Sequence, residues 1–381
     1  MGLPYVHAVP RPEPTASSPR ITVVFLLYQA ALVAPALVSG LARQVHASYP
    51  RQSDWLEALW MDDASSDGTA QAVEAAVLAL GRPAHYRVVV NPENLGLAGT
   101  LNKALGLVET PYVLTCHLDC RFGSEDYVAS MLELIDRHPR AAAITGQPVV
   151  TPDSPPPFAE KLNIVTNLMD IFPEDSANDL VPVGFAEGRC DVFRVEALRA
   201  VGFYDTHLRV AGEDQVLAAR LRERGYEIYQ APRLAYQLSV SGEQDTVRKL
   251  LRHQRLFGRA HPYIMIRVQG TRSGVLGTRA GGNRVSRALL RAIQVGSSGV
   301  YLLVVVALLA GAPTWLWASA LGLVILAKAV LFRRHLRAAH LSLLELVAFL
   351  FLQPALDVSY TFGLAEGLWH LVRGKDRGPI R

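Results

Sequence analysis

Residues 107–122 read LVETPYVLTCHLDCRF, and the predicted fold follows from this stretch. The apolar run at residues 112–115 predicts a short strand buried in a sheet. His117 and Asp119 follow it two positions apart, so their side chains point the same way if the chain stays extended. An acidic group at the carboxyl end of a central strand lies where open α/β sheets bind ligands. Asp119 is therefore a candidate metal ligand or phosphate-site residue, although such a pair taken alone is more often a solvated strand end.

Composition divides the chain into two unlike parts. Its 381 residues are enough for one large domain and further segments, and half of them are hydrophobic. Up to about residue 280 the sequence is an ordinary soluble mixture, whereas residues 292–372 are mostly apolar. The net charge is only +4 and arginines flank the apolar part, which indicates membrane topology and no nucleic-acid partner. The three cysteines lack metal-ligand spacing and fit a reducing compartment.

Four successive strand–helix units are expected in the first third of the chain. The first strand is continuously apolar, as a strand covered on both faces would be. The strands are expected at residues 21–28, 55–61, 86–90 and 112–115. Such units with short connections predict a parallel, doubly wound α/β sheet.

Two polar loops follow the second and third strands. Residues 62–69 read DDASSDGT. Asp67 or Ser66 can cap the next helix and Gly68 permits the turn, but capping alone does not need three aspartates in six residues. Residues 91–104 read NPENLGLAGTLNKA, where glycines let the backbone approach a ligand and amides at a helix start favour an anion. This second loop is neither a Walker loop nor a dinucleotide-binding fingerprint.

Taken in order, these motifs resemble those of the inverting family 2 glycosyltransferases of the GT-A fold, over about residues 20–260. That family carries an Asp-Asp-x-Ser-x-Asp-Gly-Thr segment, an Asn-x-Gly segment ending in Asn, an Asp-x-Asp motif after a strand, and a Glu-Asp pair. The corresponding residues here are 62–69, Asn94 to Asn102, His117-Leu118-Asp119 and Glu213-Asp214. The resemblance implies a GT-A, Rossmann-like mixed sheet flanked by helices and followed by C-terminal transmembrane helices.

The metal motif departs from the family pattern, and two alignments are open. In the first alignment the motif is His117-Leu118-Asp119, and His117 stands in place of the first aspartate. In the second alignment the motif is Asp119-Cys120-Arg121, and Arg121 stands in place of the second aspartate. We favour the first, because it keeps the metal-binding carboxylate. The resemblance then implies that Asp119 holds Mg²⁺ or Mn²⁺ against the donor diphosphate, which suits these hard cations, while His117 faces the sugar or ribose. In the second alignment Arg121 partly replaces the charge of the cation.

Other donor-binding residues are also implied by the resemblance. Asp63 is expected to bind the nucleotide base by a hydrogen bond. Asp62 is a second candidate, and it or Asp67 can equally be a turn or capping group. Asn94 is carried over as a donor-binding residue, although Asn94 and Asn102 more often fix the loop.

The acceptor half is expected at residues 126–265, after the nucleotide-binding half at 21–125. Inversion at an anomeric carbon requires a general base, which removes the proton of the acceptor hydroxyl while the nucleoside diphosphate leaves from the opposite face. Position in the motif series makes Asp214 that base; the alternative is that Glu213 and Asp214 merely complement the positive end of a helix. The residues expected to support the base or the acceptor are Glu213, Asp205 and Arg194.

The C-terminal part of the chain predicts a membrane anchor. Residues 292–332 are expected to form a hairpin whose two halves each cross the ~30 Å hydrocarbon core, and Lys328, the only charge in it, is expected to snorkel to the interface. Arginines on both flanks place the catalytic domain in the cytoplasm by the positive-inside rule, at a bacterial inner membrane. Residues 333–381 are expected to hold interfacial or re-entrant helices and a basic tail, with a true hairpin or buried soluble helices as alternatives. Residues 1–20 are expected to be a flexible leader and 266–291 a linker.

The sequence thus predicts an inverting transferase that moves one sugar from a nucleotide-diphosphate sugar to a lipid-linked or polysaccharide acceptor at the cytoplasmic membrane face, in exopolysaccharide or glycolipid synthesis. It is expected to be non-processive, because the Gln-x-x-Arg-Trp motif of processive synthases is replaced by QRLFG at residues 254–258. Two alternatives remain. One is another nucleotide-sugar enzyme on the same sheet, which would release pyrophosphate. The other is a degenerate, non-catalytic membrane scaffold, which the substituted His117 keeps open.

Overall fold

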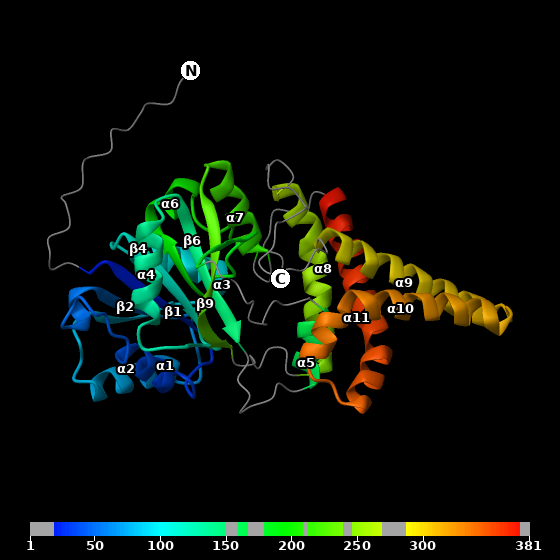
Figure 1. Ribbon diagram of the computed structural model, residues 1–381, viewed down its shortest axis with the longest axis horizontal. Coiled ribbons are helices and arrows are strands. Elements are labelled where there is room, and N and C mark those ends of the chain that lie inside the picture. Colours follow the sequence, from blue (N-terminus) through cyan, green and yellow to red (C-terminus); the bar gives the residue numbers. More distant parts are fainter. Residues whose placement is uncertain are drawn as a thin grey trace, which may run out of the picture.

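The computed structural model describes residues 19–149, 158–166, 179–208, 212–238, 246–268 and 287–373. Residues 1–18 of the predicted leader, residues 269–286 of the predicted linker and the basic tail after residue 373 lie outside these ranges. A domain of sheet and helices occupies one side of the molecule, and a bundle of long helices occupies the other (Figure 1).

The described residues form one nine-stranded mixed sheet, in the order β3-β2-β1-β4-β8-β6-β9-β5, with β7 paired to β9. The strands are β1 Ile21–Leu27, β2 Leu56–Asp62, β3 Tyr86–Val90, β4 Tyr112–His117, β5 Cys120–Phe122, β6 Ala141–Val149, β7 Val181–Pro182, β8 Cys190–Arg194 and β9 Glu227–Leu238. Strands β1 to β4 are parallel, as the strand–helix units predicted, because helices return the chain to the same edge between them. β8 runs antiparallel to β4 and β6, which makes the sheet mixed and confirms the predicted fold class.

Helices cover both faces of this sheet, α1, α2 and α4 on one face and α3, α6 and α7 on the other. Their bounds are α1 Ala34–Ala42, α2 Thr69–Ala79, α3 Gly96–Leu107, α4 Tyr127–Arg137, α6 Val195–Val201 and α7 Glu213–Glu223, and a 3₁₀ turn spans Gln52–Asp54. Successive side chains of β1 alternate between the two cores: Val23 and Phe25 pack in the first, Val24 and Leu26 in the second. Burial on both faces explains why this strand is continuously apolar.

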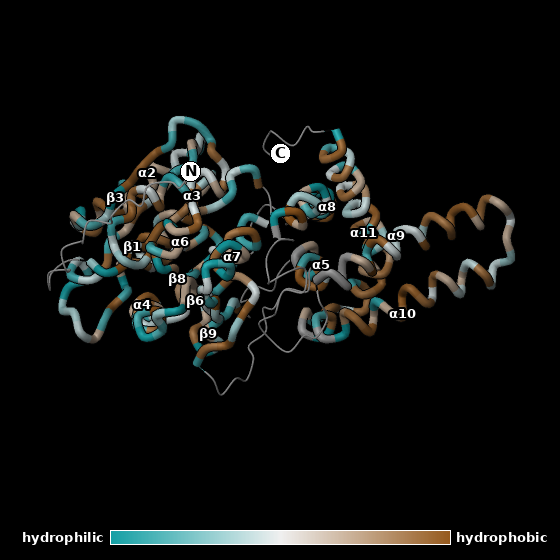
Figure 2. The backbone as a smooth tube through the Cα atoms, turned by 90° about the horizontal axis from the view of Figure 1, so that it is seen from above, coloured by the Kyte–Doolittle hydropathy of each residue, from teal (hydrophilic) through white to brown (hydrophobic). Residues whose placement is uncertain are grey.

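The remaining helices form the bundle beside the sheet domain. They are α5 Phe158–Thr166, α8 Val247–Val268, α9 Arg287–Leu309, α10 Thr314–Ala338 and α11 Leu343–Val372. α8 and α11 pack side by side, whereas α9 and α10 form a hairpin that projects across them, away from the sheet domain (Figure 1). Figure 2 shows that this hairpin is hydrophobic along most of its length. Three helical segments of the described chain are long and apolar enough to cross a membrane: Ala292–Leu309, Thr314–Arg333 and Leu343–Val372.

Glycines let α8 and α11 touch along their backbones. A Cβ atom at Gly363 would lie 1.9 Å from the backbone oxygen of Arg255, and one at Gly367 would lie 2.3 Å from that of Arg259. No larger residue fits at either place without moving a helix, because the opposing atoms are backbone. Glu366, between the two glycines, pairs with both arginines. α8 is therefore held to the bundle over much of its length.

The structure corrects three expectations about this part of the chain. Lys328 does not snorkel, because it is buried and pairs with the carboxylate of Asp357 on α11. Residues 343–372 form one continuous helix through Pro354 rather than several helices or a hairpin. The predicted domain boundary after residue 265 falls inside α8. An apolar pattern gives the length of a helix, but it does not say which distant residue a charge will meet.

Candidate active site

The carboxyl ends of β1, β2 and β4 meet at one edge of the sheet. Leu27 at the end of β1 lies opposite Asp62 of β2, and Leu26 lies opposite His117 of β4. Because parallel strands end at the same edge, the polar loops that follow them are brought together, as the sequence predicted. Most of the candidate residues lie at this edge or on the adjoining helices.

Aspartates in the loop after β2 hold that loop in place. Asp62 Oδ1 accepts hydrogen bonds from the backbone N–H of Ser65, at 3.1 Å, and from the Ser65 hydroxyl. Asp67 accepts from the backbone N–H of Thr69, at 3.1 Å, and from that of Ala31 in the loop after β1, at 3.0 Å. Desolvation alone would raise the pKa of Asp67, but a hydrogen bond from the Thr69 hydroxyl and these two backbone hydrogen bonds lower it. Both carboxylates thus serve the turn-forming role that the sequence left open.

Asp63 is buried and organises the loop after β3. Its Oδ1 accepts from Asn91 Nδ2 and from the backbone N–H of Leu95, each at 2.8 Å, and its Oδ2 accepts from the backbone N–H of Gly96 at 2.9 Å. A carboxylate offers roughly four acceptor positions, so one on Oδ2 remains for a ligand. Asn94 donates to the backbone oxygen of Asp63 at 3.3 Å and accepts from Gly96 at 3.1 Å, which are loop-fixing contacts.

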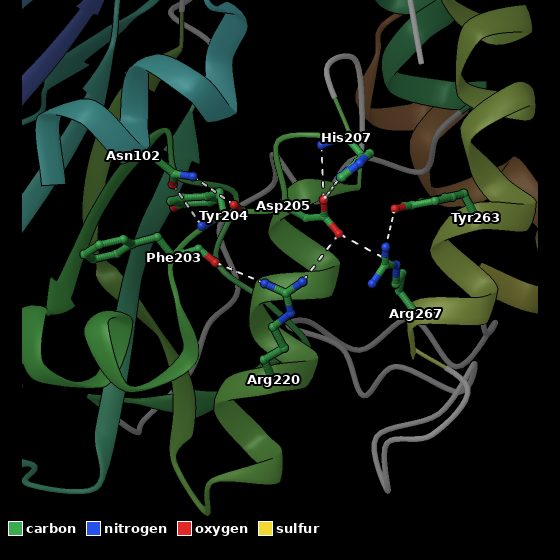
Figure 3. A network of polar contacts seen from close by, with 8 residues as sticks. All are labelled: Asn102, Phe203, Tyr204, Asp205, His207, Arg220, Tyr263 and Arg267. Carbon is green, nitrogen blue, oxygen red and sulfur yellow. Dashed lines mark hydrogen bonds and ion pairs between the residues drawn. The ribbon is translucent and has the colours of Figure 1, made fainter. Parts of the chain in front are cut away.

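Asn102 on α3 connects the two halves of the domain. Its Nδ2 donates to the backbone oxygen of Tyr204, and its Oδ1 accepts from the backbone N–H of the same residue, both at 2.9 Å (Figure 3). The side chain therefore fixes the loop after α6, which carries Asp205.

Asp119 lies beside a cation that the sequence analysis missed. Its Oδ2 is 3.9 Å from Nη1 of Arg189, whose Nε lies 3.1 Å from a carboxylate oxygen of Glu187. Burial opposes the charge of Arg189, but the carboxylates of Glu187 and Asp119 outweigh burial and raise its pKa. The backbone N–H of His117 donates to the backbone oxygen of Arg189 at 2.7 Å, next to the antiparallel pairing of β4 and β8. This register brings Arg189 to Asp119, and no motif in the sequence signals it.

Asp119 is the residue that fits a divalent cation, and His117 lies two positions before it at the end of β4. His117 Nε2 is buried without a hydrogen-bond partner in the described structure, and burial lowers the pKa of the ring, which leaves it neutral. The side chain of Arg121 points elsewhere, since its Nη1 donates to the backbone oxygens of Leu118 and Cys120 at 2.9 and 2.7 Å. Among the described residues no three His, Cys, Asp or Glu side chains gather into a metal site. A cation at Asp119 would complete its shell with diphosphate oxygens and water, as Mg²⁺ commonly does.

The acidic pair Glu213 and Asp214 begins α7, directly after Gly212 in a left-handed conformation. The Glu213 carboxyl is buried, and its Oε2 has no hydrogen-bond partner in the described part of the chain. Burial, followed by the neighbouring Asp214, raises the pKa of Glu213 to about 8. Asp214 is only half-buried, and its Oδ1 accepts from the backbone N–H of Gln215 at 2.7 Å. At neutral pH the pair therefore holds a proton on Glu213.

The two other support residues lie in different places. Asp205 is buried beside α7: its Oδ1 accepts from the backbone N–H of His207 at 3.1 Å, and its Oδ2 accepts from Arg220 of α7 at 3.4 Å. Arg194 lies at the far end of β8, opposite Tyr112 at the start of β4, with its guanidinium 5.2 Å from the centre of that ring. The structure does not bring Arg194 to the edge where the other candidates gather.

The family model for glycosyl transferase family 2 matches residues 22–202. This segment is a family 2 glycosyltransferase domain. The mannosyltransferase PcManGT from Pyrobaculum calidifontis, in complex with GDP-Man and Mn²⁺, aligns with a TM-score of 0.55 and 18% identity, over 92% of this chain and 88% of that one. The S. aureus protein TarS, residues 1–349 in complex with UDP, aligns with a TM-score of 0.43 and 18% identity, over 93% and 92% of the two chains. No curated protein gave a significant match.

Family membership confirms the central prediction from the sequence. The protein is a glycosyltransferase. The likeness to PcManGT shows a shared fold that covers most of both chains. The family match ends at residue 202, before Glu213 and Asp214, so the roles of that pair rest on the geometry at the start of α7.

Proposed function

We propose that this glycosyltransferase is inverting and non-processive, and that it transfers one sugar to a hydroxyl group of a lipid-linked or polysaccharide acceptor. The acidic pair at the start of α7 carries the proposal, because Glu213 keeps its proton at neutral pH and the neighbouring Asp214 is the less buried of the two carboxyl groups. One ionised carboxylate beside a substrate hydroxyl is what a single displacement needs. No covalent intermediate has to form.

Asp214 acts as the general base in this reaction. Its carboxylate takes the proton of the acceptor hydroxyl while that oxygen bonds to the anomeric carbon. The bond from this carbon to the diphosphate oxygen breaks on the opposite face, and its electron pair leaves with the nucleoside diphosphate. Glu213, being neutral, adds no second negative charge near the departing anion. The positive end of the α7 dipole favours the ionised form of Asp214 at the first turn.

The nucleotide base is proposed to bind at the loops after β2 and β3. The remaining acceptor position on Asp63 Oδ2 is the proposed partner for an N–H group of the base. Asp62 and Asn94 support this contact by fixing the two loops around it.

The donor diphosphate is proposed to lie at the end of β4. Asp119 would hold Mg²⁺ or Mn²⁺, whose charge offsets that of the leaving diphosphate. PcManGT was solved with GDP-Man and Mn²⁺, which supports a divalent cation on this fold. Arg189 adds a positive charge beside Asp119, and the neutral ring of His117 faces the sugar or ribose.

The enzyme is proposed to bind its acceptor at the cytoplasmic face of a bacterial inner membrane, in exopolysaccharide or glycolipid synthesis. The α9–α10 hairpin supports this, because it exposes large apolar side chains such as Leu303 and Leu323, as lipid-facing helices do. Arg333 and Arg337 are exposed at the end of α10 that lies next to the rest of the protein, in keeping with the positive-inside rule. α8 and α11 lie between the hairpin and the sheet domain (Figure 1), and they would hold the catalytic domain next to the bilayer that the hairpin enters.

Nucleotide binding and transfer test these assignments separately. The full-length protein in detergent is titrated calorimetrically with UDP, GDP and dTDP, with and without Mn²⁺. We expect metal-dependent binding of one nucleotide that is lost in Asp119→Ala but kept in Asp179→Ala, a matched change at an exposed carboxylate that pairs with Arg233. Asp214→Asn should still bind that nucleotide but lose transfer by at least ~100-fold. Transfer at the unmodified rate by Asp214→Asn would contradict the base assignment, and absence of nucleotide binding would contradict the donor site.

A further inference from the structure

The carboxylate of Asp205 joins three parts of the molecule (Figure 3). Its Oδ1 accepts from the backbone N–H and from Nδ1 of His207, at 3.1 and 3.0 Å. Its Oδ2 lies 3.4 Å from Nη2 of Arg220 on α7 and 3.8 Å from Nε of Arg267 on α8. Arg220 also donates to the backbone oxygen of Phe203, in the same loop, at 3.4 Å. One buried anion is thus shared by the loop after α6, by the helix that carries the acidic pair and by a helix of the bundle.

Arg267 is held in the orientation that this contact needs. Its Nη2 donates to the hydroxyl of Tyr263, one turn earlier on α8, and its guanidinium lies 4.9 Å from the centre of the Tyr263 ring. Such a cation–π contact and hydrogen bond restrict the side chain before it meets its partner, which lowers the entropy lost in the ion pair. The Tyr263 ring also lies 6.3 Å from the ring of His207, centre to centre.

α8 packs against the start of α7 through apolar contacts. A Cβ atom at Gly212, the residue before Glu213, would lie 2.2 Å from the Cδ1 atom of Ile264. Gly212 also has a φ of +92°, which side chains other than glycine rarely adopt. The buried residues of this contact form one small cluster: Leu208, Val216, Ala260, Tyr263 and Ile264, with Leu371 of α11 packed against it. The first turn of α7 therefore rests on a surface supplied by the bundle.

We propose that Arg267, Tyr263 and Ile264 of α8 are positioning residues for the general base. The proposal rests on the proposed function, in which Asp214 is that base. Arg267 acts through Asp205 on the body of α7, while Ile264 sets the place of its first residue. A general base must lie within hydrogen-bond reach of the hydroxyl it deprotonates, and a misplacement of about 1 Å can cost ~100-fold in rate.

The geometry also gives the bundle a role beyond anchoring. α8 is locked to α11 through Gly363 and Gly367, and α11 is joined to the hairpin through the buried pair of Lys328 and Asp357. The place of the catalytic base therefore depends on a continuous set of packed helices that reaches the segment proposed to enter the bilayer. A detached sheet domain would retain the nucleotide-binding loops but lack the surface on which α7 begins.

Paired variants of α8 test the proposal in the full-length protein. Arg267→Gln removes the contact with Asp205, Arg267→Lys keeps the charge, and Arg255→Gln is the matched control, since Arg255 is on the same helix but pairs with Glu366. Nucleoside diphosphate release is measured from UDP-glucose and GDP-mannose, with a polyprenyl-diphosphate-linked monosaccharide, which offers free sugar hydroxyls, as the acceptor probe. We expect Arg267→Gln to lower kcat at least ~10-fold with the KM for the donor and the nucleotide Kd within about twofold. Arg267→Lys should restore most of the rate, and Arg255→Gln should leave it unchanged.

Amide hydrogen exchange supplies a readout that needs no substrate. Residues 203–208 and 212–220 should exchange faster in Arg267→Gln than in Arg255→Gln, because the loop and the first turns of α7 lose their support. Asp205→Asn combined with Arg267→Gln should be no slower than Asp205→Asn alone, since both changes break one contact. Unchanged exchange in Arg267→Gln, an equal loss of kcat in Arg255→Gln, or a loss confined to KM would each overturn the proposal. A fully active Asp214→Asn enzyme would instead refute the base assignment, while the exchange data would still decide whether α8 holds α7.

Discussion

Replacing Glu213 by glutamine should make the stability of the protein less dependent on pH. Burial and the neighbouring Asp214 raise the pKa of this carboxyl from 4.5 to about 8. Below pH ~4.5 the group is protonated in both the folded and the unfolded chain, and it does not change the free energy of unfolding. Between these two pKa values the unfolded chain releases a proton that the folded protein keeps, so the free energy of unfolding falls as pH rises. The limiting slope for one group is about 1.4 kcal/mol per pH unit, and the loss is complete above pH ~8.

The Glu213→Gln variant has no proton to lose at this position, so its free energy of unfolding should lack this dependence on pH. In a domain of this size 1 kcal/mol corresponds to roughly 2–4 °C in Tm. The Tm of the variant minus that of the unmodified protein should therefore increase by up to about 3–6 °C per pH unit between pH ~5 and ~8. The measurement is the Tm of the full-length protein in one detergent across that pH range. Glu223→Gln, an exposed change at the other end of α7, is the matched control and should run parallel to the unmodified protein. A constant Tm difference between Glu213→Gln and the unmodified protein would show that Glu213 is ionised in the fold and would refute the reasoning about the acidic pair.

Two further predictions concern the bundle. Lys328→Met leaves the buried carboxylate of Asp357 without its cation and should lower the free energy of unfolding by about 3–5 kcal/mol. The double variant Lys328→Met with Asp357→Leu should recover much of this lost stability, and equal Tm values for the single and double variants would argue against the pair. Gly363→Leu places a side chain where the backbone of Arg255 lies, so it should lower the Tm and loosen the packing of α8. Gly299→Leu is the control and should be tolerated, because a Cβ there meets nothing within 4 Å. A normal Tm for Gly363→Leu would mean that the two helices do not pack this closely.

The sequence was most informative where structure depends on neighbours along the chain. Continuous apolar runs predicted β1 and β4, and the loop sequences at residues 62–69 and 91–104 predicted polar loops at one edge of the sheet, where the structure has them. The order of the motifs gave the family, which the match to residues 22–202 confirms. It also placed Asp63 and Asp119 directly after two strands, where the structure has them, because each motif is tied to the end of a strand. What the motifs did not give is the set of partners that each side chain meets.

Those partners were decided by tertiary structure. Asp119 meets Arg189 because β8 runs antiparallel to β4 in one particular register, and a shift by one residue would turn Arg189 to the other face of the sheet. Asp205 meets Arg267 because α8 packs against the start of α7, although the two residues are far apart in the sequence. Patterns of apolar and polar residues repeat over a few positions, so they specify strands, helices and the lengths of both. The angle and register at which these elements pack depend on contacts between distant side chains, and the charge arrangement of the active site depends on that packing.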